Sequence, residues 1–197
     1  DVRWINPLVP ILFISLLATG ILSLMQSALP IDLVRGGIYR PEISEGWSGA
    51  IIAVQLILLV IIQWPTGKWV AGKKLTYGFK VSLLGLGIGC LLIGLSSLFV
   101  NGALLILMAQ LPISFGLAVF LPTSTEAIIS ATPLEKQGIA MALFSQCFAI
   151  SAFIAPIISG KLLDSHGNGL ILWTSVFMLC ILFFSILNNK DIRLIKS

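Results

Sequence analysis

The side chains in this sequence that could do chemistry are few, and most of them lie inside long apolar stretches. A polar side chain is costly when it faces lipid, so each is expected to face the interior of a helical bundle. Amides and hydroxyls there form hydrogen bonds, either with a small-molecule solute or with a neighbouring helix, and both roles stay open. The candidates for solute binding are Gln26, Gln55, Gln110, Ser114 and Gln146.

Ionisable groups within the apolar stretches are rarer still. Glu126 is the one acid that could lie inside a helix, near its end. It could act as a gate by pairing with a lysine, or carry a proton; the alternative is a helix-end charge at headgroup level. An enzyme such as a lipid transferase would need a cluster of His, Asp or Cys, whereas His166 stands alone and the cysteines lie in apolar runs. We therefore expect no enzyme, no metal and no cofactor.

The composition is that of an integral membrane protein. Hydrophobic residues make up 57% of the chain and charged residues only 10%, where a soluble domain carries roughly 25% charged residues. The mean hydropathy is +1.05. The net charge of +4 comes from lysines and arginines in short loops between apolar runs. This pattern favours anchoring in a lipid bilayer and argues against nucleic acid as a partner.

Six apolar segments each approach the ~20 residues that a membrane-spanning helix requires. One domain covering 1–197 is thus predicted, with helices at about 7–29, 46–64, 79–100, 103–129, 138–163 and 170–187 and a cytoplasmic tail at 188–197. The third segment is rich in glycine, including Gly85 and Gly89, which predicts close contact with another helix. Because the chain opens on Asp1 and not on Met, we also expect a preceding segment.

Basic residues are distributed unequally between the two sides of the predicted bundle. Nine of the twelve lysines and arginines fall on the side of the two termini. These nine are Arg3, Lys68, Lys73, Lys74, Lys80, Lys136, Lys190, Arg193 and Lys196. Because positively charged loops stay in the cytoplasm, both termini are predicted to be cytoplasmic, in the inner or plasma membrane of the cell.

The second and fifth segments resemble each other. Gln55 and Pro65 in one match Gln146 and Pro156 in the other, with the same spacing, and a Gly-Lys pair follows each proline. The predicted topology runs these two segments in opposite directions. The chain therefore reads as three helices repeated in inverted orientation, a plan common among secondary transporters.

Two loop motifs resemble those of the major facilitator superfamily. That family places Gly-x-Leu-x-Asp-x-x-Gly-Arg-Arg after the second helix of each half. This chain has Gly67-Lys68-Trp69-Val70-Ala71-Gly72-Lys73-Lys74 there, with Gly78 beyond. Ala71 replaces the acid, which favours the C-terminal half, where the motif is often degenerate. A second match, Gly160-Lys161-Leu162-Leu163-Asp164, follows the fifth segment.

The resemblance implies an all-α, polytopic membrane protein: half of a major facilitator fold, with six transmembrane helices as a 3+3 inverted repeat. It implies ion-coupled antiport, efflux or symport of a small-molecule solute by alternating access, with a missing N-terminal six-helix half as partner. The alternatives are a non-transporting membrane scaffold and a six-helix transporter that works as a homodimer. The residues carried over to gating and to the loop motifs are Gly67, Lys73, Lys74, Gly78, Glu126, Gly160 and Asp164.

Overall fold

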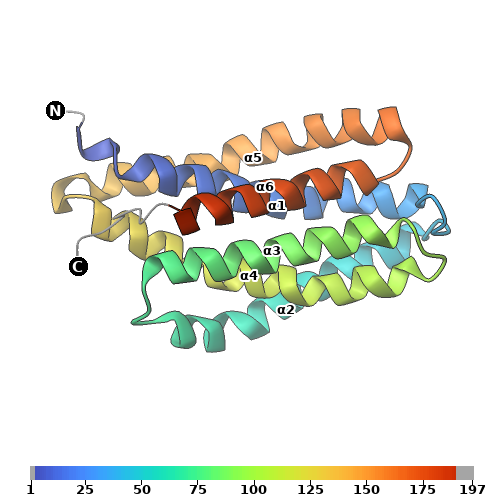
Figure 1. Cartoon of the computed structure of the whole chain (residues 1–197), viewed down its shortest axis with the longest axis horizontal. Coiled ribbons are helices and arrows are strands. Elements are labelled where there is room, and N and C mark those ends of the chain that lie inside the picture. Colours follow the sequence, from blue (N-terminus) through green and yellow to red (C-terminus); the bar gives the residue numbers. More distant parts are fainter. Residues whose placement is uncertain (1–2, 190–197) are drawn as a thin grey trace.

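The computed structural model describes residues 3–189, and these residues form an all-helical bundle (Figure 1). Each of its six long helices is long and apolar enough to cross a membrane. This confirms the predicted fold class. The helices are α1 (Leu8–Arg35), α2 (Glu45–Val70), α3 (Leu75–Ser96), α4 (Gly102–Ala131), α5 (Gln137–His166) and α6 (Leu170–Asn189). Two single-turn 3₁₀ helices, η1 (Arg3–Ile5) and η2 (Leu134–Lys136), precede α1 and α5.

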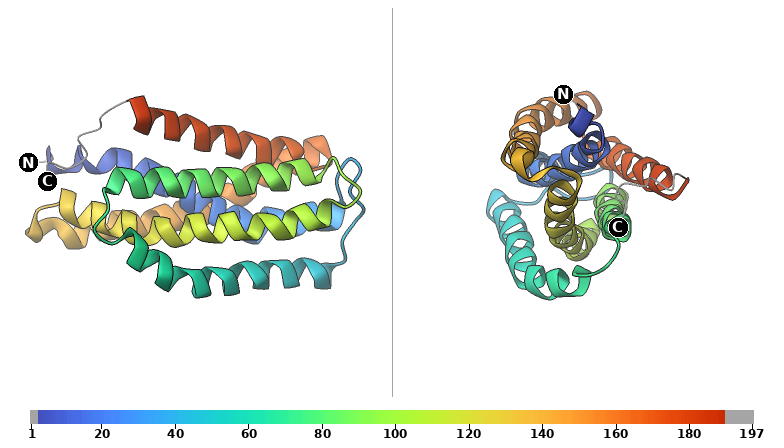
Figure 2. Two further views of the ribbon diagram at one scale, coloured as in Figure 1. Left: turned by 60° about the horizontal axis from the view of Figure 1, so that its bottom comes forward. Right: turned by 90° about the vertical axis from the view of Figure 1, so that its left-hand side faces the viewer.

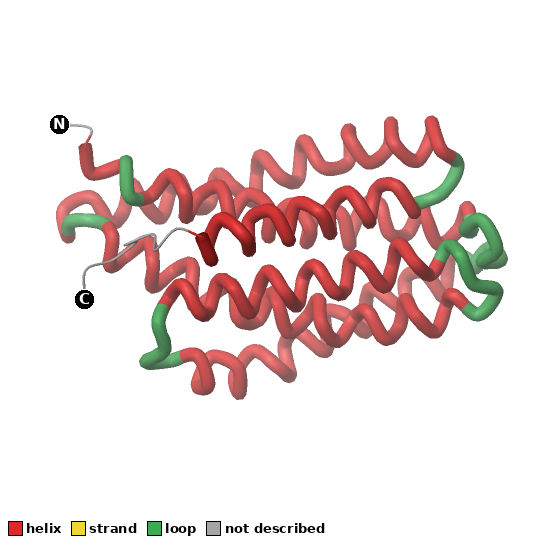
Figure 3. Tube along the Cα trace, in the orientation of Figure 1, coloured by secondary structure: helices red, strands yellow, loops and turns green. Residues whose placement is uncertain are grey.

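The helices run up and down, so the loops gather at the two ends of the bundle (Figures 1 and 3). We call the end with the N-terminus and the connections at 71–74 and 132–136 the terminal end. The opposite end, with the connections at 36–44, 97–101 and 167–169, is the distal end. The predicted tail from residue 190 onward lies outside the described residues.

Glycines set the tightest helix contact, between α3 and α4. A Cβ atom on Gly85 would lie 2.8 Å from the carbonyl oxygen of Pro112. One on Gly116 would lie 2.8 Å from the backbone nitrogen of Leu86. Only hydrogen fits at such positions, so the two backbones approach each other closely. The glycine-rich segment thus forms the predicted helix–helix contact.

Helices α2 and α5 bury the smallest share of their residues within this chain. Only 17% of the most apolar stretch of α2 is buried, and the same holds for α5, against 50% for α1 and 56% for α4. The end view shows α2 on one side of the bundle and α6 on the other, with α3 and α4 between them (Figure 2). Most of the side chains of α2 and α5 therefore face outward from this chain.

Helix α1 continues past the predicted end at Leu29 to Arg35, with Pro30 inside it. Proline removes one backbone hydrogen-bond donor and bends a helix. The last turn of α1 is nevertheless stabilised by hydrogen bonds from residues that follow the helix. The carbonyl oxygen of Asp32 accepts hydrogen bonds from the Gly36 amide at 3.1 Å and from the Arg40 guanidinium at 2.8 Å. Gly36 adopts a positive φ of 79°, which reverses the chain at this point.

Candidate functional site

The most polar of the cavities found lies at the terminal end, between the last turns of α2 and α4. Its volume is about 740 Å³. Gln63, Gly67 and Lys68 line it from α2, and Thr125 and Glu126 line it from α4. The structure thus brings two of the predicted residues, Gly67 and Glu126, to one cavity. The remaining lining residues are Trp64, Leu121, Pro122 and Ile129.

The cavity holds one basic and one acidic side chain. The ammonium of Lys68 lies over the Trp64 ring, 3.9 Å from its centroid. This cation–π contact keeps the lysine on the α2 wall. The ion pairs found among the described residues are Arg35–Asp164 and Arg40–Asp32, so Glu126 is in none of them. The exposed Glu126 carboxylate and the Lys68 ammonium therefore both line the cavity, and the lysine is in contact with the Trp64 ring.

Three predicted residues form a polar cluster between α2 and α4. Gln55, Gln110 and Ser114 are each fully buried. The Ser114 hydroxyl donates to the backbone oxygen of Gln55 at 3.1 Å. Within the described residues the Gln55 side-chain amide has no hydrogen-bond partner, and neither has the side-chain oxygen of Gln110. A buried amide without partners is costly, so a hydrogen-bond partner at Gln55 would stabilise the protein. The role of these three residues in binding a solute remains a prediction.

The other two glutamines lie on open surfaces. Gln26 on α1 and Gln146 on α5 are both exposed. They therefore differ from Gln55, Gln110 and Ser114, which are fully buried. Their predicted role in binding a solute remains a prediction.

The predicted loop-motif residues fall at both ends of the bundle. At the terminal end, the Lys73 ammonium lies 3.7 Å from the Trp69 ring centroid, and Lys74 directly precedes the first residue of α3. Gly78 packs tightly against Thr123 of α4. At the distal end, Asp164 pairs with Arg35 at 2.6 Å across the repeats, while Gly160 faces open space.

A buried charge network at the distal end was not singled out from the sequence. Arg40 and Asp32 form an ion pair of 3.1 Å, and both side chains are fully buried. The Asp32 carboxylate also accepts hydrogen bonds from the Gly169 amide at 2.9 Å and from the Trp173 indole at 3.0 Å. Arg40 donates to the Ser96 hydroxyl at the end of α3. An acid and an arginine of opposite charge close to one another in a polar loop were the available signal.

This network joins the two three-helix repeats. Asp32, Arg40 and Ser96 belong to the first repeat, whereas Gly169 and Trp173 belong to the second. A Cβ atom on Gly169 would lie 2.5 Å from the Asp32 carboxylate, so only glycine lets the α5–α6 connection approach. We call these five residues the distal clamp. They fix the start of α6 against the end of α1.

Six helices that are long and apolar enough to cross a membrane define a polytopic α-helical membrane protein. The family-level comparison is more specific, because the sequence model of the Major Facilitator Superfamily matches residues 6–187. The chain therefore belongs to this superfamily, as the loop motifs predict.

Curated relatives come from several strains of Escherichia coli. The chain is 28% identical over 166 residues to "Multidrug resistance protein MdtG" of strain 536 / UPEC and of strain CFT073 / ATCC 700928 / UPEC. The protein of the same name from strain K12 / DH10B is also 28% identical. In each case the match covers 82% of this chain and 38% of the relative. The chain thus spans about two fifths of the length of these relatives.

Proposed function

We propose that this chain forms one six-helix half of a secondary transporter, which moves a small molecule across the membrane by alternating access. The observation that carries the proposal is the cavity of about 740 Å³ between α2 and α4, with the Glu126 carboxylate on its wall. An ionisable residue within a membrane-spanning helix is a candidate for binding a solute or carrying a proton. Superfamily membership supports the same function.

The Glu126 carboxylate suits coupling to an ion. It lies in α4, it is exposed to the cavity, and Lys68 lies on the facing wall. In one state of the transporter it can bind a proton or a cationic group, and in another it can pair with a lysine. Transport would then be ion-coupled antiport, efflux or symport, with Glu126 as gate or proton carrier.

The second half of the transporter would meet α2 and α5. These two helices bury only 17% of their most apolar stretches within this chain. The relatives are longer, since the match covers 38% of them. We infer that an N-terminal six-helix half covers this face, and that this chain is the C-terminal half, because Ala71 replaces the acid of the first loop motif. Basic residues at the terminal end favour a cytoplasmic position for that end of the bundle.

The relatives named for multidrug resistance favour export of toxic compounds as the physiological role. The mainly apolar cavity wall, with Trp64, Leu121 and Ile129 beside the two charges, would suit an amphipathic compound.

The role of Glu126 is tested by transport in cells. The intact protein is produced in a bacterial strain deprived of its own exporters, and growth is measured against a panel of toxic compounds. We expect the unaltered protein to raise the tolerated concentration of at least one compound and Glu126→Gln to return it to background. Glu135→Gln is the control, because Glu135 is an exposed acid in η2 that does not line the cavity.

The amounts of each variant in the membrane are compared by immunoblot, so that poor insertion is not mistaken for lost transport. Full resistance with Glu126→Gln would remove that residue from the mechanism while leaving transport intact. A protein that moves no compound in any variant would favour the scaffold alternative. A functional chain of this length alone would favour the homodimer.

A further inference from the structure

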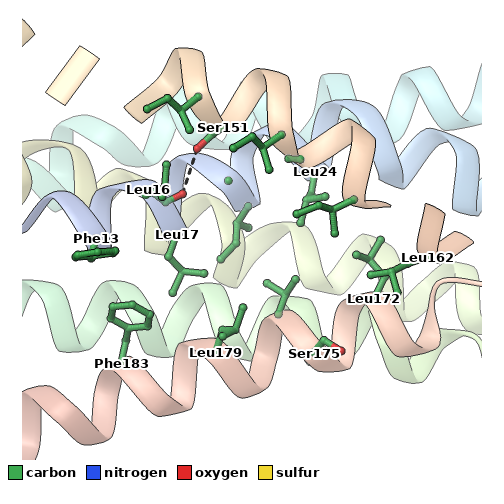
Figure 4. A pocket seen from close by; sticks show the side chains of 17 residues that line it. Phe13, Leu16, Leu17, Leu24, Ser151, Leu162, Leu172, Ser175, Leu179 and Phe183 are labelled. Atoms are coloured by element: carbon green, nitrogen blue, oxygen red, sulfur yellow. Dashed lines mark hydrogen bonds between the residues drawn. The ribbon is translucent and has the colours of Figure 1, made fainter. Parts of the chain in front are cut away.

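A second cavity lies between α1, α5 and α6 (Figure 4). Its volume is about 370 Å³. Leu17 and Leu24 of α1 form its floor, Ile154 of α5 forms one wall, and Leu179 of α6 forms the other. We call this cavity the α5–α6 groove.

The lining of the groove is apolar almost throughout. Its polar side chains are Ser151 and Ser175, and no charged residue lines it. The Ser151 hydroxyl is already engaged, because it lies 3.2 Å from the Leu16 carbonyl oxygen and 2.8 Å from the Thr19 hydroxyl (Figure 4). Ser175 is exposed at the edge of α6. A polar or ionic solute would therefore find almost no partner in the groove.

The groove exists because α6 cannot approach α1 as α3 approaches α4. In the inverted repeat, α6 corresponds to α3 and α1 corresponds to α4. The α3–α4 contact depends on Gly85 and Gly116, whereas α6 contains no glycine or alanine between Leu170 and Asn189. Large side chains such as Phe183 line the groove from α6 and keep the two backbones apart. The sequence of α6 thus leaves a space that the repeat closes elsewhere.

The distal clamp closes one end of this space. Trp173 of α6 donates to Asp32 of α1 at 3.0 Å, so the first turn of α6 is held against α1. Leu162 and Leu172 meet at that end of the groove, while Phe13 and Phe183 stand at the other (Figure 4). The groove is therefore an elongated slot, pinned at the distal end and running along the membrane-spanning part of α6.

We propose that the α5–α6 groove binds one acyl chain of a membrane phospholipid. An acyl chain matches the apolar lining and the elongated shape, and the surrounding bilayer supplies it directly. Burying apolar surface contributes roughly 25 cal/mol per Å² in water, but inside a bilayer the gain comes from close packing against the slot. The proposal rests on the membrane-spanning fold and is independent of the transport proposed above.

The test uses the intact protein in detergent-free vesicles of phosphatidylcholine containing a trace of phosphatidylcholine with a photoreactive diazirine near the end of one acyl chain. After illumination, labelled residues are mapped by mass spectrometry. The diagnostic residues are Ile21 and Leu24, which are 1% and 7% exposed and lie on the floor of the groove. Ile88 of α3 reports general contact with lipid, because it is 48% exposed, does not line the groove and lies on neither of the two helices that the second half would cover.

We expect labelling of Ile21 and Leu24 in the unaltered protein and its loss when the groove is filled. Ser175→Phe fills it from α6, and Gly20→Leu fills it from α1, where the nearest atom to an added Cβ is the Ser151 hydroxyl at 3.9 Å. Ser130→Phe is the matched control, because Ser130 is an exposed serine on α4 outside the groove. Labelling of Ile88 alone, or floor labelling that survives both filling variants, would overturn the proposal.

Discussion

At the scale of single residues, the most constrained group in this chain is the Asp32 carboxylate. It is fully buried, pairs with Arg40, and accepts hydrogen bonds from Gly169 and Trp173. Removing a carboxylate and a guanidinium from water costs several kcal/mol for each ion, and close partners offset that cost only when they surround the charges. The distal clamp supplies those partners from both repeats. Arg40 and Asp32 should therefore depend strongly on each other.

Replacing Arg40 with methionine should destabilise the protein severely. Arg40→Met leaves the buried Asp32 carboxylate without its counter-ion, a change that costs about 3–5 kcal/mol in buried pairs. The double variant Asp32→Asn with Arg40→Met should recover part of this loss, because no unpaired charge remains. The free energy of unfolding would be compared in detergent by a denaturant titration.

Arg35→Met is the matched control for this experiment. Arg35 also pairs with an aspartate, Asp164, but their side chains are 40% and 68% exposed. Exposed ion pairs contribute little, so this variant should unfold nearly as the unaltered protein does. Equal losses for Arg35→Met and Arg40→Met would mean that the buried network has no special role.

At the scale of helices, glycine decides which neighbours come close. Helix α3 presents Gly85 to α4 and Gly87 to α6, where an added Cβ would lie 3.2 Å from the Cys180 Cβ atom. The centre of the bundle is therefore built on α3. Helix α6 contains no glycine, so it cannot pack as closely on α1, and the α5–α6 groove lies between the two helices.

Adding one methyl group at the α3–α4 contact should weaken the bundle. Gly116→Ala would place a Cβ 2.8 Å from the Leu86 nitrogen and 2.9 Å from the Ser82 carbonyl oxygen. These are backbone atoms, so the helices must separate, at a cost typical of overpacked cores of about 1–3 kcal/mol. In thermal unfolding of the purified proteins, we expect a lower midpoint temperature for Gly116→Ala than for the unaltered protein.

Gly160→Ala serves as the comparison at this scale. Nothing in this chain lies within 4 Å of a Cβ built there, and alanine favours a helix over glycine by about 1 kcal/mol. This variant should unfold at the same temperature as the unaltered protein or higher. A Gly116→Ala protein that is as stable as Gly160→Ala would contradict the close packing of α3 on α4.

At the scale of the whole molecule, the two ends of the bundle differ in chemistry. The distal end is joined across the repeats by the buried clamp, whereas the terminal end holds the cavity with Lys68 and Glu126. A bundle fixed at one end and polar at the other is suited to moving as a rigid half against a partner. The orientation of these ends in the membrane then decides on which side the cavity opens.

The predicted orientation can be checked with two single cysteines in a variant whose native cysteines are replaced. Ile38→Cys lies in the α1–α2 connection at the distal end, where Ile38 is 50% exposed. Leu134→Cys lies between α4 and α5 at the terminal end, where Leu134 is 86% exposed. In intact cells a membrane-impermeant maleimide should label only Ile38→Cys. Labelling of Leu134→Cys before the membrane is permeabilised would reverse the predicted topology.

Much of the fold follows from the sequence alone. Runs of apolar residues near the length of a membrane span predict six helices. This works because the thickness of the bilayer sets the length of apolar sequence that each spanning helix needs, whatever its neighbours are. Glycines in the third segment predict a close helix contact, because the absence of a side chain lets two backbones approach each other. The loop motifs predict the superfamily. Of the candidate site, Gly67 and Glu126 were singled out, and the structure places both at one cavity.

The tertiary structure decided which residues meet. Gln55 and Gln146 look equivalent in the repeat, yet one is fully buried against α4 and the other is exposed. The sequence predicts Asp32 to be part of a polar loop. Its hydrogen-bond partners Gly169 and Trp173 lie 137 and 141 residues further along the chain, so their meeting could not be predicted from the local sequence. Such contacts depend on how whole helices pack, because hydropathy gives each helix a length and a depth in the membrane but no neighbour. The distal clamp and the α5–α6 groove both belong to that level of structure.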